Sequence, residues 1–295
     1  MLLFERLSDQ TAMTELEQSI ADYFLNVGYE LGQKSSRSIA AELFVSPSTV
    51  SRFCQQVGYS GFSAFKDAYL KELDYLDRNT QQVDPNRPFT AKDKNKALAN
   101  KIATLYKDTV DDTFDLVEHD SLQQATRMLL QAKTIIIGAA GDPLEMAETF
   151  KNRMLKIGKA VQVERRADNF FFQAYNAKPD VCFILLSYSG EVETLLKTAD
   201  LLQHRGIPSL AITSYGNNQL ARLADVTLYL STREKLVDNL GNFSSLLSLS
   251  FLLDVLYANV FTQTYQGNYQ QRKDVSRAFE EHRKSDNPII DDFNQ

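Results

Sequence analysis

The stretch SIAAELFVSPSTVSRFCQQVGYSGFSAFK, residues Ser38–Lys66, decides how the N-terminal part of this chain is interpreted. Within it, Ser46 followed by Pro47 predicts a helix start, because serine caps a first turn and the fixed φ of proline suits the first helical position. This helix should end near Gly58. A shorter helix is expected just before it, over about 38–44. Ala40 within that shorter helix would let the two helices cross closely.

The helix predicted after Ser46 has an apolar face and a polar face. The apolar face holds Val50, Phe53, Cys54 and Val57. The polar face holds Ser48, Ser51, Arg52 and Gln55. Short hydroxyl side chains let a helix approach DNA closely, while arginine and glutamine reach base edges or phosphates. Periodicity alone leaves two interpretations about even: a DNA recognition helix, or an amphipathic surface helix of any small bundle.

The charge of the chain makes any DNA site a local one. The net charge is −6, which argues against general electrostatic attachment to nucleic acid. Between Lys34 and Lys66, however, the local net charge is +3, since Glu42 is the one acid among the basic residues Lys34, Arg37, Arg52 and Lys66. Contacts to phosphates generally supply much of the binding energy, so this small patch is suitably placed.

Two elements of the quoted stretch resemble the helix-turn-helix of the RpiR (MurR/RpiR) family of bacterial regulators. They are V-S-x-x-T-V-x-R-F at 45–53 and G-[FY]-x-G-[FY] at 58–62, within a similarity over about 16–73. The resemblance implies a double-stranded DNA operator as partner, with Arg37 and Lys66 as phosphate contacts. It implies that the major groove is faced by Ser46, Ser48, Thr49, Ser51 and Arg52. For Ser46, a capping role is an equally good interpretation.

The remaining pattern predicts an α/β protein, with an all-α helix-turn-helix bundle followed by a five-stranded parallel, doubly wound domain. Five short apolar runs alternate with helical segments, as in parallel sheets covered on both faces. The runs are Thr134–Ile137, Ala160–Val163, Val181–Leu186, Ser209–Thr213 and Val226–Leu230. A polar, proline-containing segment precedes them. We therefore expect a DNA-binding domain at 1–78, a linker at 79–96 and an effector domain at 97–295.

A serine- and glycine-containing loop, Ser187–Glu191, follows the third run and precedes a helix. Ligands bind at the carboxyl ends of such strands, and free amides, hydroxyls and a helix N-terminus can cradle a phosphate there. A plain helix cap explains the loop equally well. The loop resembles the S-x-S-G-x-T element of the SIS (sugar isomerase) domain, in a similarity over about 134–258. The resemblance implies a sugar or sugar-phosphate effector held by Gly141, Asp142, Ser187, Tyr188, Ser189, Gly190, Glu191 and Glu234.

Two positions depart from the SIS pattern. Val192 stands where a threonine is expected, and Asp142-Pro143 replaces a serine in the first loop. A carboxylate beside a phosphate dianion would repel it. We favour Asp142 as an N-cap, with Glu145 completing a capping box, over ligand contact. A neutral or cationic sugar-like ligand, a phosphosugar in a shifted pose, and a domain kept for dimerisation all stay open.

Other features of the chain point to a cytoplasmic protein. Its two cysteines, Cys54 and Cys182, fall in different domains, which gives no basis for a disulfide. The N-terminus lacks the pattern of a signal peptide, and the apolar stretch Leu246–Phe261 is interrupted by polar residues and too short to span a bilayer. We expect that stretch to be a buried helix, and no membrane partner. His119, His204 and His282 show no metal-ligand spacing, and no cofactor or catalytic residue is predicted.

Three functions were weighed from the sequence. The first is a DNA-binding transcriptional regulator of carbohydrate genes, controlled by a sugar or sugar phosphate and acting as a homodimer or higher homo-oligomer, because operators are usually read as paired half-sites. The second is a sugar-phosphate isomerase or lyase, for which Glu234 could act as acid or base. The third is a DNA-binding dimer without an effector. The first best accounts for both resemblances.

Overall fold

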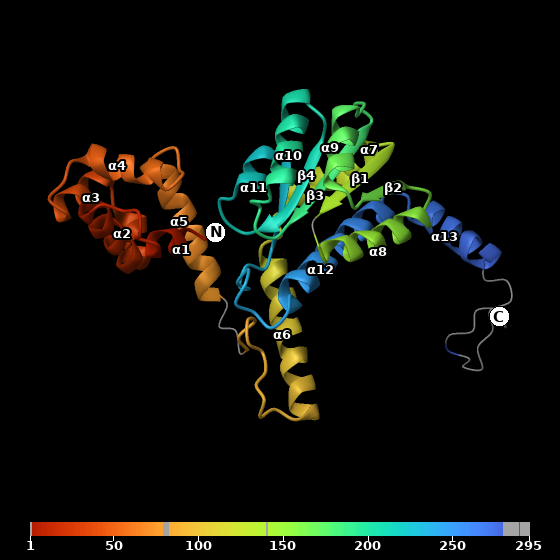
Figure 1. Ribbon diagram of the computed structural model, residues 1–295, viewed down its shortest axis with the longest axis horizontal. Helices are drawn as coiled ribbons and strands as arrows, with labels where there is room; N and C mark the ends of the chain where they lie inside the picture. Colours follow the sequence, from red (N-terminus) through yellow and green to blue (C-terminus); the bar gives the residue numbers. More distant parts are fainter. Residues whose placement is uncertain (1, 79–82, 140, 280–288, 290–295) are drawn as a thin grey trace.

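The N-terminal region is a helical bundle closed around aromatic side chains. The computed structural model describes residues 2–78, 83–139, 141–279 and 289 (Figure 1). The bundle contains α1 (Leu3–Ser8), α2 (Glu15–Val27), the 3-10 helix η1 (Gly28–Gln33), α3 (Ser36–Glu42), α4 (Pro47–Gln56) and α5 (Phe62–Arg78). Phe24 is at its centre, where the ring lies 4.5 Å from that of Phe65 and 6.0 Å from that of Phe53. These buried rings fix how α2, α4 and α5 pack.

Local capping explains where several of these helices begin. Thr14 caps α2 and shares a reciprocal capping box with Glu17, and Ser46 caps α4 by accepting from the Thr49 amide at 3.2 Å. The sequence pattern did not reveal α1, which is too short to show periodicity. Its first amides, those of Leu3 and Phe4, donate to the buried Glu72 carboxylate on α5 at 2.7 and 2.8 Å. Burial raises the pKa of Glu72.

The C-terminal region is a parallel sheet with helices on both faces. After α6 (Asn95–Asp115) and α7 (His119–Gln131), the chain forms β1 (Thr134–Ala139), α8 (Pro143–Leu155), β2 (Ala160–Glu164), α9 (Ala167–Tyr175), β3 (Val181–Ser187), α10 (Glu193–Arg205), β4 (Ser209–Ser214), α11 (Gln219–Leu223), β5 (Val226–Leu230) and α12 (Phe243–Thr262). All strands are parallel in the order β2-β1-β3-β4-β5. The predicted fold class is confirmed.

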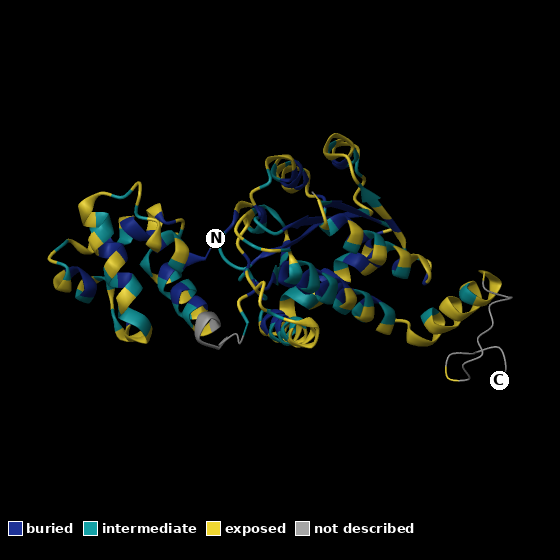
Figure 2. Ribbon diagram, turned by 60° about the horizontal axis from the view of Figure 1, so that its bottom comes forward, coloured by how far each residue is buried: buried dark blue, intermediate teal, exposed yellow. Residues whose placement is uncertain are grey.

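The strands alternate their side chains between two cores, as a sheet buried on both faces requires. Ile135 and Ile137 of β1 face one core, where α7, α8 and α12 pack, whereas Ile136 between them faces the other, where α9, α10 and α11 pack. Figure 2 shows the strands as the most buried part of the molecule. The strand order reverses between β1 and β3, and such switch points are where doubly wound folds bind ligands.

Helix α12 is the one helix, within the part of the chain that the structure describes, that is long and apolar enough to cross a membrane. Its residues instead pack on the sheet and on α6 and α8, and Leu249, Leu252 and Leu256 are buried in the core. The expectation of a buried helix here is confirmed. The following helix, α13 (Tyr265–Phe279), has no buried residue. His282 lies outside the described residues.

Residues 83–94, within the predicted linker, lie against the effector domain. Asn86 makes most of the contacts: its side chain donates to the Arg233 carbonyl at 3.1 Å and accepts from the Lys235 amide at 2.7 Å. Its own carbonyl accepts from the Leu240 amide at 2.9 Å. The predicted linker residues 79–82 lie outside the described residues. The segment therefore braces the loop that follows β5.

Candidate functional site

The polar face of α4 is open to solvent. Ser48, Arg52 and Gln55 are exposed, and Thr49 and Ser51 are half-buried. The opposite face, with Val50, Phe53 and Cys54, is buried in the bundle. Ser46 is exposed as well, and its hydroxyl bonds the Ser48 and Thr49 hydroxyls at 2.7 and 2.8 Å as well as capping the helix. The hydroxyls therefore satisfy one another locally while remaining accessible.

The basic side chains near α4 differ in how free they are. Arg52 and Arg37 are exposed, and among the described residues neither has a hydrogen-bond or ion-pair partner. Lys66 is half-buried, and its ammonium donates to the Lys34 carbonyl at 3.1 Å. Lys34 pairs with Glu42 at 2.7 Å. The two arginines are therefore available to an anionic partner, and the two lysines are held within the bundle.

Phe44, in the turn between α3 and α4, is a surface feature that the sequence did not indicate. It is 96% exposed and has a φ of +54°, which is uncommon for a residue with a bulky side chain. Both properties are unfavourable in isolation, since the ring is in water and the backbone is left-handed. The turn is tight because the Val45 amide donates to the Ala40 carbonyl at 2.9 Å, directly before the Ser46 cap.

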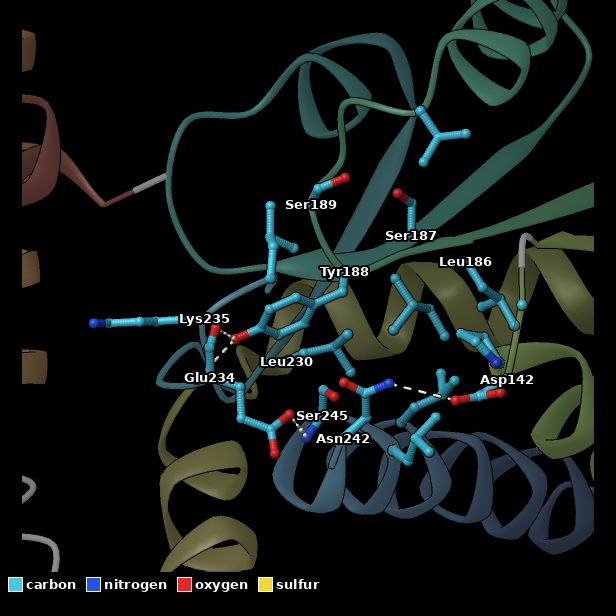
Figure 3. Close-up of a pocket in the computed structure, with 17 residues that line it drawn as sticks. Asp142, Leu186, Ser187, Tyr188, Ser189, Leu230, Glu234, Lys235, Asn242 and Ser245 are labelled. Atoms are coloured by element: carbon cyan, nitrogen blue, oxygen red, sulfur yellow. Dashed lines mark hydrogen bonds between the residues drawn. The ribbon is translucent and has the colours of Figure 1, made fainter. Parts of the chain in front are cut away.

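A cavity of about 310 Å³ opens at the carboxyl ends of the strands, at the switch point of the sheet (Figure 3). This volume is at the lower end of the range for small-ligand sites. Most of the effector residues proposed from the sequence line it, namely Gly141, Asp142, Ser187, Tyr188, Ser189 and Glu234. Gly190 and Glu191 are not among the lining residues. The cavity gathers these groups from the loops after β1, β3 and β5.

The Ser187–Glu191 loop is held by its own hydroxyls. The Ser187 hydroxyl accepts from the Gly190 amide at 3.1 Å, and the Ser189 hydroxyl accepts from the Glu191 amide at 3.2 Å. Gly190, with a φ of +66°, is packed against Asn218. The Glu191 carboxylate accepts from the Gln219 amide at 3.0 Å. The second half of the loop thus turns toward the loop after β4 instead of toward the cavity.

Glu234 is buried and its carboxylate is already engaged. Its two oxygens accept from the Ser244 and Ser245 amides at 2.7 and 2.9 Å, which caps the N-terminus of α12 (Figure 3). The backbone of Glu234 also pairs with the Tyr188 hydroxyl, which donates to its carbonyl at 2.8 Å and accepts from its amide at 3.1 Å. Burial raises the pKa of Tyr188, so this hydroxyl stays protonated. Both residues shape the cavity wall.

The N-cap position predicted for Asp142 is confirmed, but the capping hydrogen bond predicted for its side chain is wrong. Asp142 does precede Pro143 at the start of α8, but its backbone is helical and its side chain makes no cap hydrogen bond. Glu145 pairs with Arg165 at 3.0 Å instead of closing a capping box. The Asp142 carboxylate accepts from the Asn242 side chain at 3.4 Å across the cavity (Figure 3). This carboxylate is therefore a polar group of the cavity.

The segment before and at the start of α12 also contributes to the cavity, which the sequence pattern did not indicate. Lys235, Asn242 and Ser245 line the cavity, together with the apolar Leu246 and Leu249. Lys235 is adjacent to Glu234 in the sequence and could have been flagged as a cation near an anion site. The others could not, because only the packing of α12 across the sheet brings them to the loops after β1 and β3.

The two cysteines carry no reactive site. Cys54 and Cys182 are free and buried, and burial raises the pKa of each thiol to about 12. Over residues 2–78, 83–139 and 141–279, no group of three or more histidine, cysteine, aspartate or glutamate side chains is placed to hold a metal ion. The cavity therefore offers hydroxyls, amides and the Asp142 carboxylate to a ligand, and the exposed face of α4 is a second, separate surface.

Comparisons with known proteins match both regions. A family model described as the helix-turn-helix domain of the rpiR family matches residues 1–74, and the SIS domain model matches residues 128–259. An HTH-type transcriptional regulator of Haemophilus influenzae is 26% identical over 84% of this chain and 85% of its own length. The regulator YbbH of Bacillus subtilis is 24% identical, with 85% and 87% covered.

Solved structures share the fold. The Vibrio vulnificus NanR protein complexed with ManNAc-6P superposes with a TM-score of 0.60 at 21% identity, covering 94% of this chain and 98% of that one. The sugar isomerase domain of an RpiR transcription factor from Sphaerobacter thermophilus gives 0.55 at 18% identity, covering 61% of this chain and 98% of that domain. The first of these likenesses extends over both regions.

Proposed function

Because this chain belongs to the rpiR family of helix-turn-helix transcriptional regulators that carry a SIS domain, we propose that a sugar or sugar phosphate in its cavity controls how it binds an operator. The observation that carries the proposal is the pairing, in one chain, of an exposed polar face on α4 with a separate cavity at the sheet switch point. NanR, with ManNAc-6P bound, supports a phosphorylated sugar as the effector class. We propose a DNA-binding domain at 1–78, and we extend the effector domain from the expected 97–295 to about 83–295, because Asn86 is bonded to the loop after β5.

The DNA contact surface that we propose is the face of α4 with Ser48, Ser51, Arg52 and Gln55, supported by Arg37. Arg52 and Arg37 are exposed and have no partner among the described residues, which leaves both guanidiniums available for bases or phosphates. Ser46 already caps α4, and its exposed hydroxyl could contact the DNA backbone in addition. Lys66 is the weakest candidate, since its ammonium already donates to a carbonyl.

Effector binding is proposed for the cavity residues Ser187, Ser189 and Asp142, with Lys235 and Asn242 added. The Ser189 hydroxyl is suited to an anionic or hydroxyl group, and the Asp142 carboxylate is suited to sugar hydroxyls or an amine. The Lys235 ammonium, which lies 3.8 Å from the Asp238 carboxylate, would have to leave that pair to reach a ligand. Gly141, Tyr188 and Glu234 form part of the cavity wall. Gly190 and Glu191 do not line the cavity and contact the loop after β4 instead. A phosphate would have to lie away from Asp142, because like charges at about 4 Å repel by a few kcal/mol at intermediate dielectric.

An enzymatic role is disfavoured by the state of Glu234. A general acid or base must reach the substrate, whereas this carboxylate is buried and accepts two backbone amides. We propose that the protein is not an isomerase or lyase. We also propose a cytoplasmic location, which two free, buried cysteines support, and a homodimer, which the usual pairing of operator half-sites supports.

The DNA-binding proposal is tested with Arg52→Ala. DNA that the full-length protein selects from a random pool serves as the probe, titrated at fixed salt. We expect the affinity to fall by about 1–3 kcal/mol, or roughly 5–150-fold, if Arg52 reads a base. Arg127→Ala, an exposed arginine on α7, is the matched control and should bind as the wild type does. Equal affinity for Arg52→Ala and the wild type would exclude Arg52 from the interface.

The effector proposal is tested by thermal shift with ManNAc-6P and with unphosphorylated N-acetylmannosamine. Preferential binding to the folded state raises Tm, and a rise with either compound supports the proposal. Asp142→Asn should increase the shift with the phosphorylated sugar more than with the neutral one, because it removes a like charge. If neither compound raises Tm, a wider panel of sugars and sugar phosphates is screened, and no rise with any of them would contradict sugar sensing.

A further inference from the structure

We propose that Arg6, Asn217 and Gly58 form a latch that transmits the state of the Ser187–Glu191 loop, here named the effector loop, to α4, the proposed recognition helix. The proposal rests on the proposed function and adds the route by which the two sites communicate. Arg6 lies on α1, Gly58 lies just after α4, and Asn217 lies in the loop after β4. Figure 1 shows the N-terminal bundle beside the α11 side of the sheet, where this loop is found.

Arg6 bridges the two domains. Its guanidinium donates to the Val57 carbonyl at the end of α4 at 2.8 Å and also to the Asn217 carbonyl. The Asn217 side chain donates in return to the Gly58 carbonyl at 2.9 Å. Two of these hydrogen bonds end on backbone carbonyls at the C-terminal end of α4, those of Val57 and Gly58, and the third ends on the Asn217 carbonyl. Movement of Asn217 would therefore change the angle at which the effector domain holds α4.

The other side of the Asn217 loop packs directly on the effector loop. The neighbouring Asn218 is buried and occupies the space beside Gly190, where a Cβ would come within 2.1 Å of its Oδ1 atom. The Leu220 amide donates to the Gly190 carbonyl at 3.0 Å, and the Gln219 amide donates to the Glu191 carboxylate at 3.0 Å. The effector loop and the loop after β4 are in direct contact, so a shift of one displaces the other.

The effector loop reaches the cavity with its first half and the latch with its second. Ser187 and Ser189 line the cavity, whereas Gly190 and Glu191 face the loop after β4. Suppose that the effector loop has two positions and that a sugar binds Ser189 more tightly in one of them. The sugar would then shift the population toward that position, and such a difference in affinity is what coupling requires. At the far end, Glu72 fixes the start of α1 to α5, so that Arg6 moves with the DNA-binding bundle.

The test uses the reciprocity of coupling, so no sugar has to be identified. If the cavity loop influences DNA binding, DNA must influence the cavity loop by the same free energy. Hydrogen exchange is measured on the full-length protein with and without DNA that it has selected from a random pool. In the wild type, we expect DNA to change exchange at least about fivefold in residues 187–191 and 213–219, which is the lower end of typical coupling free energies.

Arg6→Ala should reduce that change, and the double variant Arg6→Ala/Asn217→Ala should abolish it, with protection by DNA at α4 left in place. Asn217→Ala is the second single variant and should behave as Arg6→Ala does. Lys71→Ala is the matched control, because Lys71 also faces the effector domain, through an exposed pair with Glu118 at 4.0 Å, but has no bond to the latch. Native exchange in β3 and β4 confirms that each variant folds.

The latch is overturned by either of two results. One is a wild-type protein that binds selected DNA with no change in exchange at 187–191. The other is an unchanged response in Arg6→Ala or Asn217→Ala. Failure of the wild type to select any DNA sequence would be a different result, which contradicts the proposed function itself and the latch with it.

Discussion

Two groups of hydroxyl side chains in this molecule are used in opposite ways. On α4, Ser46, Ser48 and Thr49 bond one another over at most three residues and stay at the surface. Between α6 and α12, Thr109 bonds Ser244 at 3.0 Å and Thr113 bonds Ser248 at 2.8 Å, with all four residues buried. The first group leaves a face free for a partner, while the second group holds the domain together.

The buried group continues into a charged pair. The Ser231 amide donates to the Ser248 hydroxyl at 2.9 Å, and the Ser231 hydroxyl donates to the Asp112 carboxylate. Arg233 lies 3.6 Å from that carboxylate. Asp112 is buried, and Arg233 directly precedes Glu234, which lines the cavity. The two groups differ in that the surface hydroxyls have local partners alone, whereas the buried hydroxyls also bond residues far along the chain, and these long-range bonds mark them as structural.

The largest effect should come from Asp112→Ala. It leaves Arg233 and the Ser231 hydroxyl without this carboxylate in a buried setting, and breaking such a pair costs about 3–5 kcal/mol. Chemical denaturation measures the loss. Asp111→Ala, at an exposed neighbouring position on α6, is the control and should change stability by less than about 0.5 kcal/mol. Equal stability of the two variants would show that the buried group does not hold α6.

Ser248→Ala and Ser48→Ala compare the two groups directly. Ser248→Ala should destabilise the protein by about 1–3 kcal/mol, since the buried Ser231 amide and Thr113 hydroxyl lose a partner. Ser48→Ala should leave the unfolding free energy within about 0.5 kcal/mol of the wild type. The effect on affinity for selected DNA should be reversed: Ser48→Ala should bind this DNA more weakly than the wild type, and Ser248→Ala should bind it equally well. A destabilised Ser48→Ala would remove the distinction between the groups.

The smallest effect should come from Phe44→Gly, next to the surface group. Glycine adopts a positive φ without strain, whereas a bulky residue there costs about 1–2 kcal/mol. Part of this gain is offset by the larger entropy of glycine in the unfolded chain, about 0.5–1 kcal/mol. We expect a net stabilisation of at most about 1 kcal/mol, measured as the denaturation midpoint. Phe44→Ala, which keeps a Cβ at that φ, is the control and should not be stabilised.

The sequence allowed prediction where the determinants are local. The start of α4 at Ser46-Pro47, the alternation of five apolar runs and the position of the Ser187–Glu191 loop all depend on neighbouring residues, and the structure has each of them. Helix α1 was not predicted, because the Leu3 amide in its first turn is bonded by Glu72, which lies 69 residues away in the sequence. No local pattern carries that information.

The candidate site was predicted only in part for the same reason. Asp142-Pro143 has the local signature of a cap, yet the side chain pairs with Asn242, 100 residues further along the chain. Glu234 was considered as a sugar ligand, and only the packing of α12 shows that it caps that helix. In both places a partner far along the chain decides what the side chain does, and the local sequence does not show that partner.

The contacts of Asn86 have a practical consequence for building hybrid regulators. Its side chain and carbonyl are bonded to the Arg233–Leu240 stretch, so residues from Val83 onward are a piece of the sensor. A chimera that joins a foreign DNA-binding module at Asn95, where α6 begins, would lack Asn86 and its hydrogen bonds to the loop beside the ligand cavity. The junction should instead lie upstream of Val83, so that the transplanted half keeps Asn86 in place.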